Sequence, residues 1–474
     1  MAANPFIGVM YHWIGGLAAA SFYIPYKAVR KWSWETYWLV GGFFSWIIAP
    51  ICLAWLLVPN VWHVLGEADG RTLLLAYGFG VLWGIGGLTF GLSMRYLGIA
   101  LGMAVALGFC AAFGTLMPPI FQGQIGAIFA SASGRFTLLG VLVCLVGIAI
   151  SGMAGMSKER EMSDEQKKAS IAEFNFGKGI LVASFAGVMS SCMAFGLAGG
   201  APIATLAKAQ LLAHHDSPLW QNLPILVVVL LGGFTTNFIW CVALNLSHGS
   251  AGEYINAPGG DNNGGLGRDA TRAANFHDSM AEISATEAVS PWDTDALKSP
   301  AGVPTGAGPA AAAAELPDLA QIRAPLLNNY TFSALAGVIW YLQFFFYSMG
   351  ETEMGKYKFA SWTLHMASII IFSTLWGVAL KEWTGTSKRT HWLIAAGLAV
   401  LIGSTVVIGY GSYLQAAANT HKAAAAGRAH VSRRDLRSRL YVGATGHRGR
   451  CAIGIGRANH VSSVSVNRAV SSVG

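Results

Sequence analysis

The chain has 474 residues, of which 54% are apolar and only 11% are Asp, Glu, Lys or Arg. Ordinary soluble domains carry about 25% charged residues. So few charges cannot cover a water-soluble fold of this length, which excludes that class and leaves a modest basic excess, a formal net charge of +8. The six cysteines show no CxxC or similar spacing, so we expect neither a disulfide framework nor a metal site.

Apolar segments of roughly 20 residues recur along the chain, each long enough to cross about 30 Å of hydrocarbon as a helix. They predict an all-α integral membrane protein with about ten transmembrane helices. The sixth segment, rich in Ser and Gly, is the least regular. The ten segments are Phe6–Tyr26, Thr36–Val58, Thr72–Met94, Ile99–Ile120, Phe136–Met156, Gly179–Gly199, Leu223–Leu244, Tyr330–Met349, Ala360–Leu380 and Trp392–Tyr413.

The loop charges give a predicted orientation, because Lys and Arg mark the cytoplasmic side of a membrane protein. The loops after the first, third, fifth, seventh and ninth segments hold 16 of these residues, and the intervening loops hold 5. We therefore expect the first set of loops to be cytoplasmic and both termini to lie outside. The tail beyond Tyr413 carries the other 10 and opposes this orientation, but charges far from a helix end steer topology weakly.

Two segments differ from the rest in composition. Residues 247–324 are rich in Gly, Pro, Ala, Asn and Asp and predict a disordered loop insertion, which divides helices 1–7 in residues 1–246 from helices 8–10 in residues 325–415. Residues 416–474 predict a basic disordered tail. Such a tail could bind nucleic acid, but a plain disordered extension or an altered reading frame is the simpler interpretation, so no nucleic-acid partner is predicted.

Enzyme chemistry finds little support in the sequence. The chain contains no HExxH, GxSxG or GxxxxGK[ST] motif, and the paired intramembrane carboxylates that acid/base chemistry requires are missing. We therefore expect no catalytic residues, no metal and no cofactor.

Three scarce titratable residues near membrane depth are candidates for proton coupling. His12 lies in the first segment and His365 in the ninth, and an imidazole can load and release a proton near neutral pH. Glu35 lies where the second segment begins and can do so if burial raises its pKa. Each histidine could equally be an interhelical hydrogen-bonding residue, and Glu35 could simply be a boundary residue paired with Lys31.

Aromatic and amide side chains form a second candidate set, because sugars stack their C–H faces on Trp or Tyr rings and hydrogen-bond through their hydroxyls. Trp340, Gln343 and Tyr347 are three and four residues apart and share one face of the eighth helix. The alternative is that the tryptophans are membrane-interface anchors and the amides make interhelical bonds. The substrate-binding candidates are Trp34, Trp38, Asn237, Trp340, Gln343, Tyr347 and Trp362.

Several strings resemble the bacterial L-rhamnose/proton symporter family. The longest is YHWIGGLAAASFYIPYKAVRKWSWETYW at Tyr11–Trp38, followed in the same order by MRYLG at Met94, GTLMPPIF at Gly114, WYLQFFFY at Trp340, SWTLHM at Ser361 and LKEW at Leu380. The match covers helices 1 to 5 and 8 to 10 and is looser over helices 6 and 7. The long loop and the basic tail depart from the family pattern.

This resemblance implies the drug/metabolite transporter superfamily, with two five-helix inverted repeats and a location in the cytoplasmic (inner) membrane. It also implies L-rhamnose and protons as partners, with the proton gradient in place of a cofactor. In that reading Phe344 or Phe346 would face the C6 methyl group of rhamnose. L-Lyxose is a related possible substrate, and no oligomeric state is assigned.

Two other function classes remain open at this stage. One is a drug/metabolite-type exporter or exchanger of another small solute without proton coupling. The other is a membrane-embedded enzyme or assembly factor. A rise of external pH on adding L-rhamnose to de-energised cells distinguishes a symporter from both.

Overall fold

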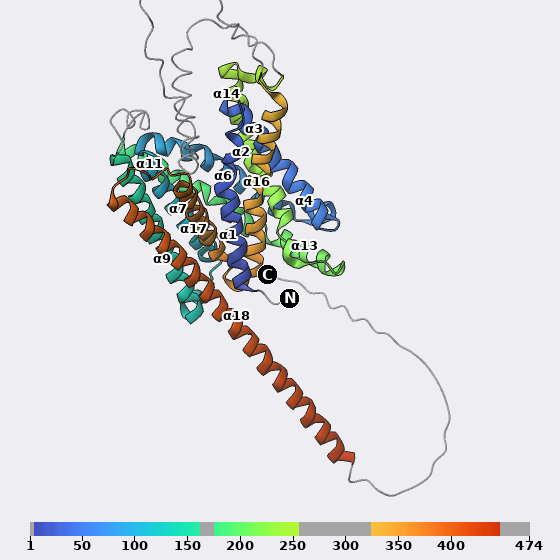
Figure 1. Ribbon diagram of the computed structural model, residues 1–474. Coiled ribbons are helices and arrows are strands. Elements are labelled where there is room, and N and C mark those ends of the chain that lie inside the picture. The colour runs from blue at the N-terminus through green and yellow to red at the C-terminus, as the bar shows by residue number, and fades with distance from the viewer. Residues whose placement is uncertain (1–3, 162–174, 256–323, 446–474) are drawn as a thin grey trace, which may run out of the picture. The chain divides into compact units, whose positions relative to one another are not determined.

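A computed structural model describes residues 4–161, 175–255 and 324–445, and every regular element in these ranges is helical (Figure 1). Ten of the helical spans are long and apolar enough to cross a membrane. Each lies over one of the ten predicted segments, so the all-α membrane fold is confirmed. The spans are built from α1 (Pro5–Ser21) with α2 (Tyr23–Tyr26), α3 (Trp34–Phe43) with η1 (Phe44–Ile48) and α4 (Ala49–Leu57), α6 (Gly70–Leu97), α7 (Ile99–Phe121), α9 (Ala132–Glu161), α11 (Phe176–Ser190) with α12 (Cys192–Gly199), α14 (Leu223–His248), α16 (Leu326–Glu353), α17 (Ser361–Ala379) and α18 (Lys388–Thr445).

Short helices connect several of these spans. They are α5 (Val61–Glu67), α8 (Ile125–Ala130), α13 (Ala201–Ala213), η2 (Pro218–Trp220), η3 (Ser250–Ile255) and η5 (Gly355–Ala360). The Ser- and Gly-rich sixth span is interrupted at Ser191, between α11 and α12, as its irregular composition suggests.

Glycines allow the spanning helices to approach closely. A methyl group at Gly15 of α1 would lie 2.9 Å from the backbone oxygen of Gln343 in α16, and one at Gly16 would overlap Ser368 of α17. In the same way Gly140 and Gly147 of α9 face Ile408 and Leu401 of α18. Small residues at such crossings are the usual means by which membrane helices pack.

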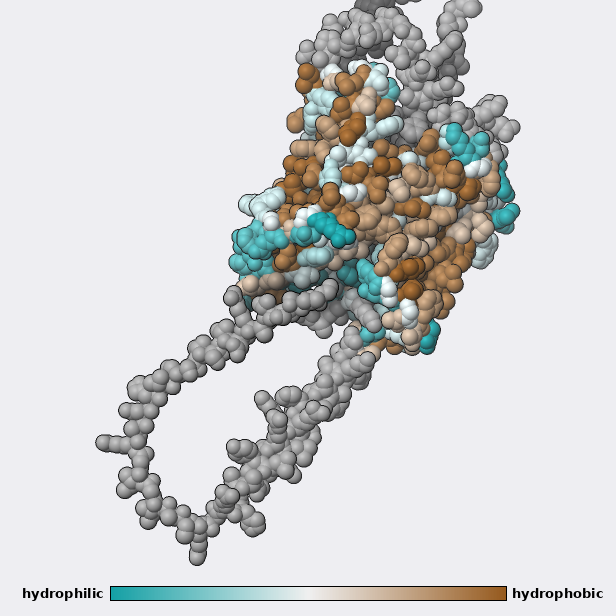
Figure 2. Space-filling model, turned by 180° about the vertical axis from the view of Figure 1, so that it is seen from behind, coloured by the Kyte–Doolittle hydropathy of each residue, from teal (hydrophilic) through white to brown (hydrophobic). Residues whose placement is uncertain are grey.

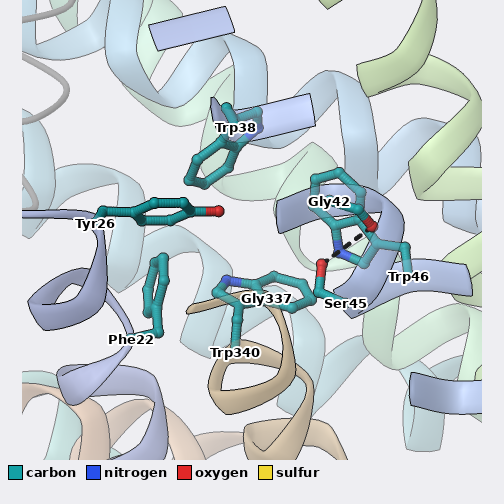
Figure 3. A pocket seen from close by; sticks show the side chains of 8 residues that line it. All are labelled: Phe22, Tyr26, Trp38, Gly42, Ser45, Trp46, Gly337 and Trp340. Atoms are coloured by element: carbon teal, nitrogen blue, oxygen red, sulfur yellow. Dashed lines mark hydrogen bonds between the residues drawn. The ribbon is translucent and has the colours of Figure 1, made fainter. Parts of the chain in front are cut away.

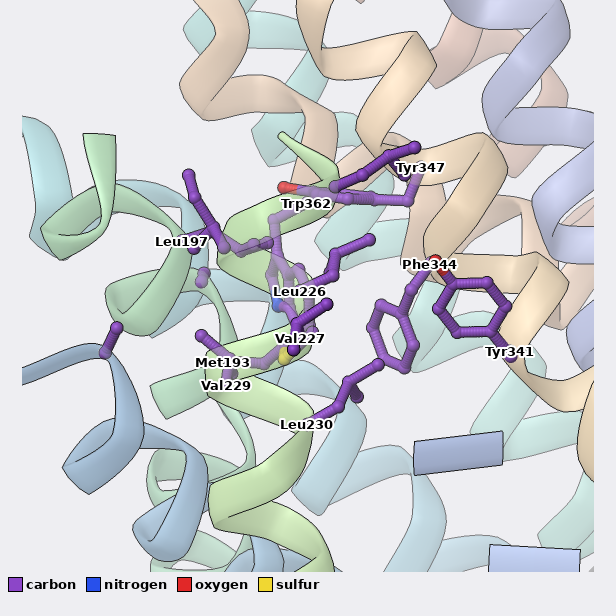
Figure 4. Close-up of a cluster of buried hydrophobic side chains, with 14 of the residues drawn as sticks. Met193, Leu197, Leu226, Val227, Val229, Leu230, Tyr341, Phe344, Tyr347 and Trp362 are labelled. Carbon is purple, nitrogen blue, oxygen red and sulfur yellow. The ribbon is translucent and has the colours of Figure 1, made fainter. Parts of the chain in front are cut away.

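The first and sixth spans, which would be equivalent in two five-helix repeats, pack against equivalent partners. Helix α1 packs against α16 and α17, the eighth and ninth spans, while α11 packs against α6 and α7, the third and fourth. A hydrophobic core fills the space between α12, α14, α16 and α17, with Leu226, Leu230 and Phe344 among its members (Figure 4).

The outer surface of the described residues is apolar. Trp55, Leu56, Phe121, Leu181 and Val406 each expose more than 60% of their surface. Figure 2 shows hydrophobic side chains over most of one face, with hydrophilic ones gathered at its margins. Such a surface is stable against lipid tails and not against water.

The predicted segment boundaries differ from the structure at two points. The loop was predicted from residue 247, but α14 continues to His248 and the helix η3 follows; residues 256–323, the rest of the predicted loop, lie outside the described residues. The tail predicted from residue 416 begins as helix, since α18 continues to Thr445. Seven of the eleven residues from 416 to 426 are alanine, the strongest helix former, which explains this continuation. Residues 418–445 belong to a unit separate from residues 1–417.

Candidate functional site

An aromatic cavity lies between the first, second and eighth spans (Figure 3). The empty space among its side chains measures about 180 Å³, part of it open to the surroundings. Little of that space accepts even a water molecule, so the rings nearly fill it and a sugar could enter only after the helices move apart. The residues that line it are Phe22, Tyr26, Trp38, Gly42, Ser45, Trp46, Gly337 and Trp340.

A local irregularity of the second span places two of these residues. Residues Phe44–Ile48 form a π-helix, in which the Ala49 N–H donates to the Phe44 carbonyl five residues back. Pro50 follows, and because proline has no N–H, the carbonyl of Trp46 cannot receive the ordinary α-helical hydrogen bond. The wider turn carries Ser45 and Trp46 to the cavity.

Glycines make room for the rings. A methyl group at Gly42 would lie 2.6 Å from the Trp46 ring, and one at Gly41 would overlap the Tyr26 hydroxyl. Gly337 of α16 contacts the backbone of Gly41 so closely that a methyl group there would overlap the Gly41 carbonyl. The cavity therefore depends on a close crossing of α3 and α16.

Two of the predicted sugar-binding residues line this cavity, and two more contact one of them. Trp38 and Trp340 line it, and Trp34 stacks on Trp38 with ring centres 5.3 Å apart and planes 14° from parallel. The Trp38 indole donates to Asn237 Oδ1 over 3.4 Å, and Asn237 is 7% exposed. Trp34 and Asn237 are buried, while Trp38 and Trp340 are partly buried.

The two predicted histidines form a second cluster together with Tyr347 and Trp362. The rings of His12 and His365 are fully buried with centres 6.5 Å apart, and the Tyr347 ring lies 5.3 Å from each. None of the four imidazole nitrogens has a hydrogen-bond partner in the part of the chain that the structure describes. Gly350 makes this arrangement possible, since a methyl group there would lie 2.8 Å from the His12 ring.

Trp362 holds one side of this histidine cluster in place. Its indole donates to the Cys110 carbonyl of α7 over 3.1 Å, and its ring packs edge-on against Tyr347 at 5.7 Å. Figure 4 shows the two rings next to each other at the border of the apolar core.

One side chain connects the cavity to the histidine cluster. The Phe344 ring lies 5.2 Å from Trp340 and 6.1 Å from His365 and is 3% exposed. Gln343, 6% exposed, precedes it on α16 and lies one helical turn from Tyr347. Phe346 stacks on Tyr11 with ring centres 6.4 Å apart, and its Cβ lies near Gly15 on the same side as His365.

Glu35 belongs to neither cluster. Its carboxylate is 2.9 Å from His248 Nδ1 and accepts from Ser250 Oγ over 2.9 Å. Ser250 also donates to Asn245 over 3.1 Å, and Asn245 donates to the hydroxyl of Tyr254. These bonds tie α3, α14 and η3 together, so Glu35 is a buried member of a polar network. Its predicted alternative pairing with Lys31 stays a prediction.

Helix η3 is fastened to the bundle by further bonds. Glu253 accepts from the backbone and the hydroxyl of Ser33 over 2.7 and 2.9 Å, and the Trp32 indole donates to its carbonyl oxygen over 3.0 Å. The Tyr330 hydroxyl donates to the carbonyl of Tyr254. Partial burial raises the pKa of Tyr254 to about 12, so that its hydroxyl keeps its proton.

Sequence reasoning missed Tyr26, Trp46 and His248. The first two carry no distinguishing signal among 14 tyrosines and 16 tryptophans, although Pro50 in the middle of an apolar segment marks an irregular turn. His248 is 213 residues from Glu35 in the chain, and no spacing connects them. Within the described residues no three His, Cys, Asp or Glu side chains gather as metal ligands would; the predicted lack of a metal site stays a prediction.

A family model and the most similar curated proteins carry the same name. A family model described as L-rhamnose-proton symport protein matches residues 1–248 and 314–414. The chain is 34% identical over 411 residues to an L-rhamnose-proton symporter of Pectobacterium carotovorum, covering 86% of this chain and 99% of the relative. A Pectobacterium atrosepticum protein of the same name is 33% identical with the same coverage, and one of Yersinia pestis is 32% identical over 406 residues, 85% of this chain and 97% of the relative. Helix η3 lies outside the matched ranges.

Proposed function

Because the chain belongs to the L-rhamnose-proton symport protein family, we propose that it carries L-rhamnose together with protons into the cell across the cytoplasmic membrane. The observation in the structure that best supports this is the pairing of an aromatic cavity with two buried histidines, joined by Phe344. The proton gradient supplies the energy, and the mechanism requires no cofactor, metal or catalytic residue.

The aromatic cavity is the proposed sugar site. Trp38 and Trp340 offer ring faces for the C–H faces of the sugar, while Tyr26 and Ser45 offer hydroxyls for its hydroxyl groups. Phe344 extends the apolar wall toward the C6 methyl group of the sugar. This methyl group distinguishes a 6-deoxy sugar from a hexose that carries a hydroxyl at C6. We place L-rhamnose here first and L-lyxose second, since the latter lacks the methyl group.

The histidine cluster is the proposed proton site. A buried imidazole with two unpaired nitrogens gains hydrogen bonds when water or a hydroxyl reaches it and can then hold a proton. His12 and His365 are the first candidates and Glu35 the third, because the Glu35 carboxylate already has two partners.

For alternating access, two sets of contacts are the proposed gates. One is the polar network of Glu35, His248 and Ser250, and the other is the apolar cluster that contains Leu230 and Phe344. The corresponding packing of the first and sixth spans supports the two inverted five-helix repeats implied by the family resemblance. Opening one gate while the other holds would move the sugar across.

The decisive experiment adds L-rhamnose to de-energised cells that express the chain and records the external pH. A transient rise that a protonophore abolishes is expected, together with entry of labelled L-rhamnose. Entry of the label without a pH change would contradict proton coupling, as for an exchanger. No entry of L-rhamnose, with entry of another sugar such as L-lyxose from a labelled panel, would contradict the substrate assignment.

A further inference from the structure

The indole N–H of Trp46 is a buried donor without an acceptor at the edge of the aromatic cavity. Trp46 is 3% exposed, and its Nε1 has no hydrogen-bond partner in the described part of the chain. Two indoles of the candidate site are satisfied, since Trp38 donates to Asn237 and Trp362 donates to the Cys110 carbonyl. A buried donor left unpaired carries the full cost of its desolvation, so a group that supplies an acceptor at this place is strongly favoured.

We propose that the Trp46 indole N–H donates to one hydroxyl of the transported sugar and thereby selects for that hydroxyl. The proposal rests on the proposed function and adds a specificity-determining residue to it. A sugar hydroxyl oxygen is an acceptor, and a site built to bond a hydroxyl rejects analogues that lack it, because its own donor then stays unpaired.

Aromatic rings surround the Trp46 ring, and its Nε1 bonds to none of the described residues. Its ring centre is 5.4 Å from Trp340, 6.2 Å from Trp38 and 6.4 Å from both Trp83 and Phe234. The cavity hydroxyl next to it in sequence, Ser45, is already directed to the Gly42 carbonyl over 3.3 Å (Figure 3).

The backbone also fixes the position of this ring. Gly42 faces one edge of the six-membered ring, and the π-helical turn before Pro50 sets the direction of the side chain. π-Helical turns are frequent at functional sites, where they redirect a side chain out of the regular helical register. Trp46 thus combines a π-helical backbone with an indole N–H that has no partner among the described residues.

Trp13 provides a matched control within the chain. Its Nε1 is likewise buried and without a partner among the described residues, but its ring packs edge-on against Phe372 at 6.1 Å and does not line the cavity. Loss of an unpaired indole N–H at Trp13 should therefore leave sugar recognition unchanged.

The test compares L-rhamnose with its four monodeoxy analogues, lacking the hydroxyl at carbon 1, 2, 3 or 4, as competitors of labelled L-rhamnose uptake. In the unmodified protein one analogue should bind about five- to tenfold more weakly, as expected for one lost neutral hydrogen bond. Trp46→Phe should raise the KM for L-rhamnose by about that factor while leaving the inhibition constant of that analogue unchanged. Trp13→Phe should change neither.

A second variant separates the N–H from the ring. Benzothienylalanine at position 46 keeps the bicyclic shape and replaces the N–H by sulfur, so it should reproduce the change of selectivity even if Trp46→Phe folds poorly. An unchanged KM in this variant, or an equal loss of affinity for L-rhamnose and all four analogues, would overturn the proposal. The proposed function fails separately, by absence of L-rhamnose uptake in the unmodified protein.

Discussion

Replacement of the buried histidines tests the number of protons carried with each sugar. The ring centres of His12 and His365 are 6.5 Å apart. At an effective dielectric constant of about 20, two unit charges at that distance repel by roughly 2.5 kcal/mol, which disfavours the doubly protonated pair by roughly 70-fold. We therefore expect the pair to carry one proton per cycle and not two.

One proton sets a ceiling on accumulation. A proton-motive force of about 150 mV is worth about 3.5 kcal/mol per proton, which limits accumulation of the sugar to roughly 300-fold; two protons would permit roughly 10⁵-fold. The assay measures the steady-state ratio of internal to external L-rhamnose in proteoliposomes at an imposed gradient, together with the alkalinisation per sugar.

Removal of the titratable ring should abolish this accumulation without abolishing binding. His12→Gln or His365→Gln keeps a polar side chain but not the proton, so exchange of labelled for unlabelled sugar should continue while uphill uptake and alkalinisation stop. The reasoning is refuted if accumulation well above 300-fold is measured, or if both variants and Glu35→Gln all retain coupled uptake.

Three further changes probe the parts that surround the two clusters. Pro50→Ala restores the missing backbone donor and should let the π-helical turn relax, raising the KM for L-rhamnose severalfold; Pro119→Ala in α7 serves as the comparison, and equal KM values in all three proteins would contradict the assigned role of the turn. Gly337→Ala should destabilise the α3–α16 crossing by about 1–3 kcal/mol through overpacking and lower the unfolding temperature in detergent, whereas Gly108→Ala, which meets no atom within 4 Å, should not. Glu253→Gln weakens the two bonds to Ser33 by up to about 1.5 kcal/mol and should speed sugar exchange by loosening η3, and a slower or unchanged exchange rate would show that η3 does not restrain opening.

The sequence allowed the spans to be predicted because hydropathy depends on local composition alone. The ten segments needed only the length of the hydrocarbon layer, and the structure places a helix over each of them. The extent of α18 was not predicted, because the irregular basic residues beyond residue 426 obscured the helix-forming alanine run before them.

The proton-coupling candidates were selected because titratable residues are rare in the apolar segments, without any knowledge of which residues lie close together. His12 and His365 were selected as rare titratable groups in apolar segments, and they prove to be neighbours although 353 positions separate them. The spacing of three and four residues in α16 predicted that Trp340, Gln343 and Tyr347 share a face, but it could not indicate that Trp340 lines the cavity while Tyr347 packs against the histidines. Which site each side chain joins depends on which helix packs against that part of α16. Those helices come from distant parts of the sequence, so the local spacing does not reveal them.

The position of Phe344 suggests how sugar and proton binding are coupled. Its ring touches Trp340 on the cavity side and His365 on the other, and it belongs to the apolar layer with Leu230. A sugar that enters the nearly filled cavity must displace a ring, and Trp340 and Phe344 are packed so closely that displacement of one moves the other. Movement of Phe344 would expose the His365 ring, whose nitrogens have no partner among the described residues, to water and thus to protons. Sugar binding would then favour protonation, and protonation would favour sugar binding by the same factor, because linkage between two sites is reciprocal.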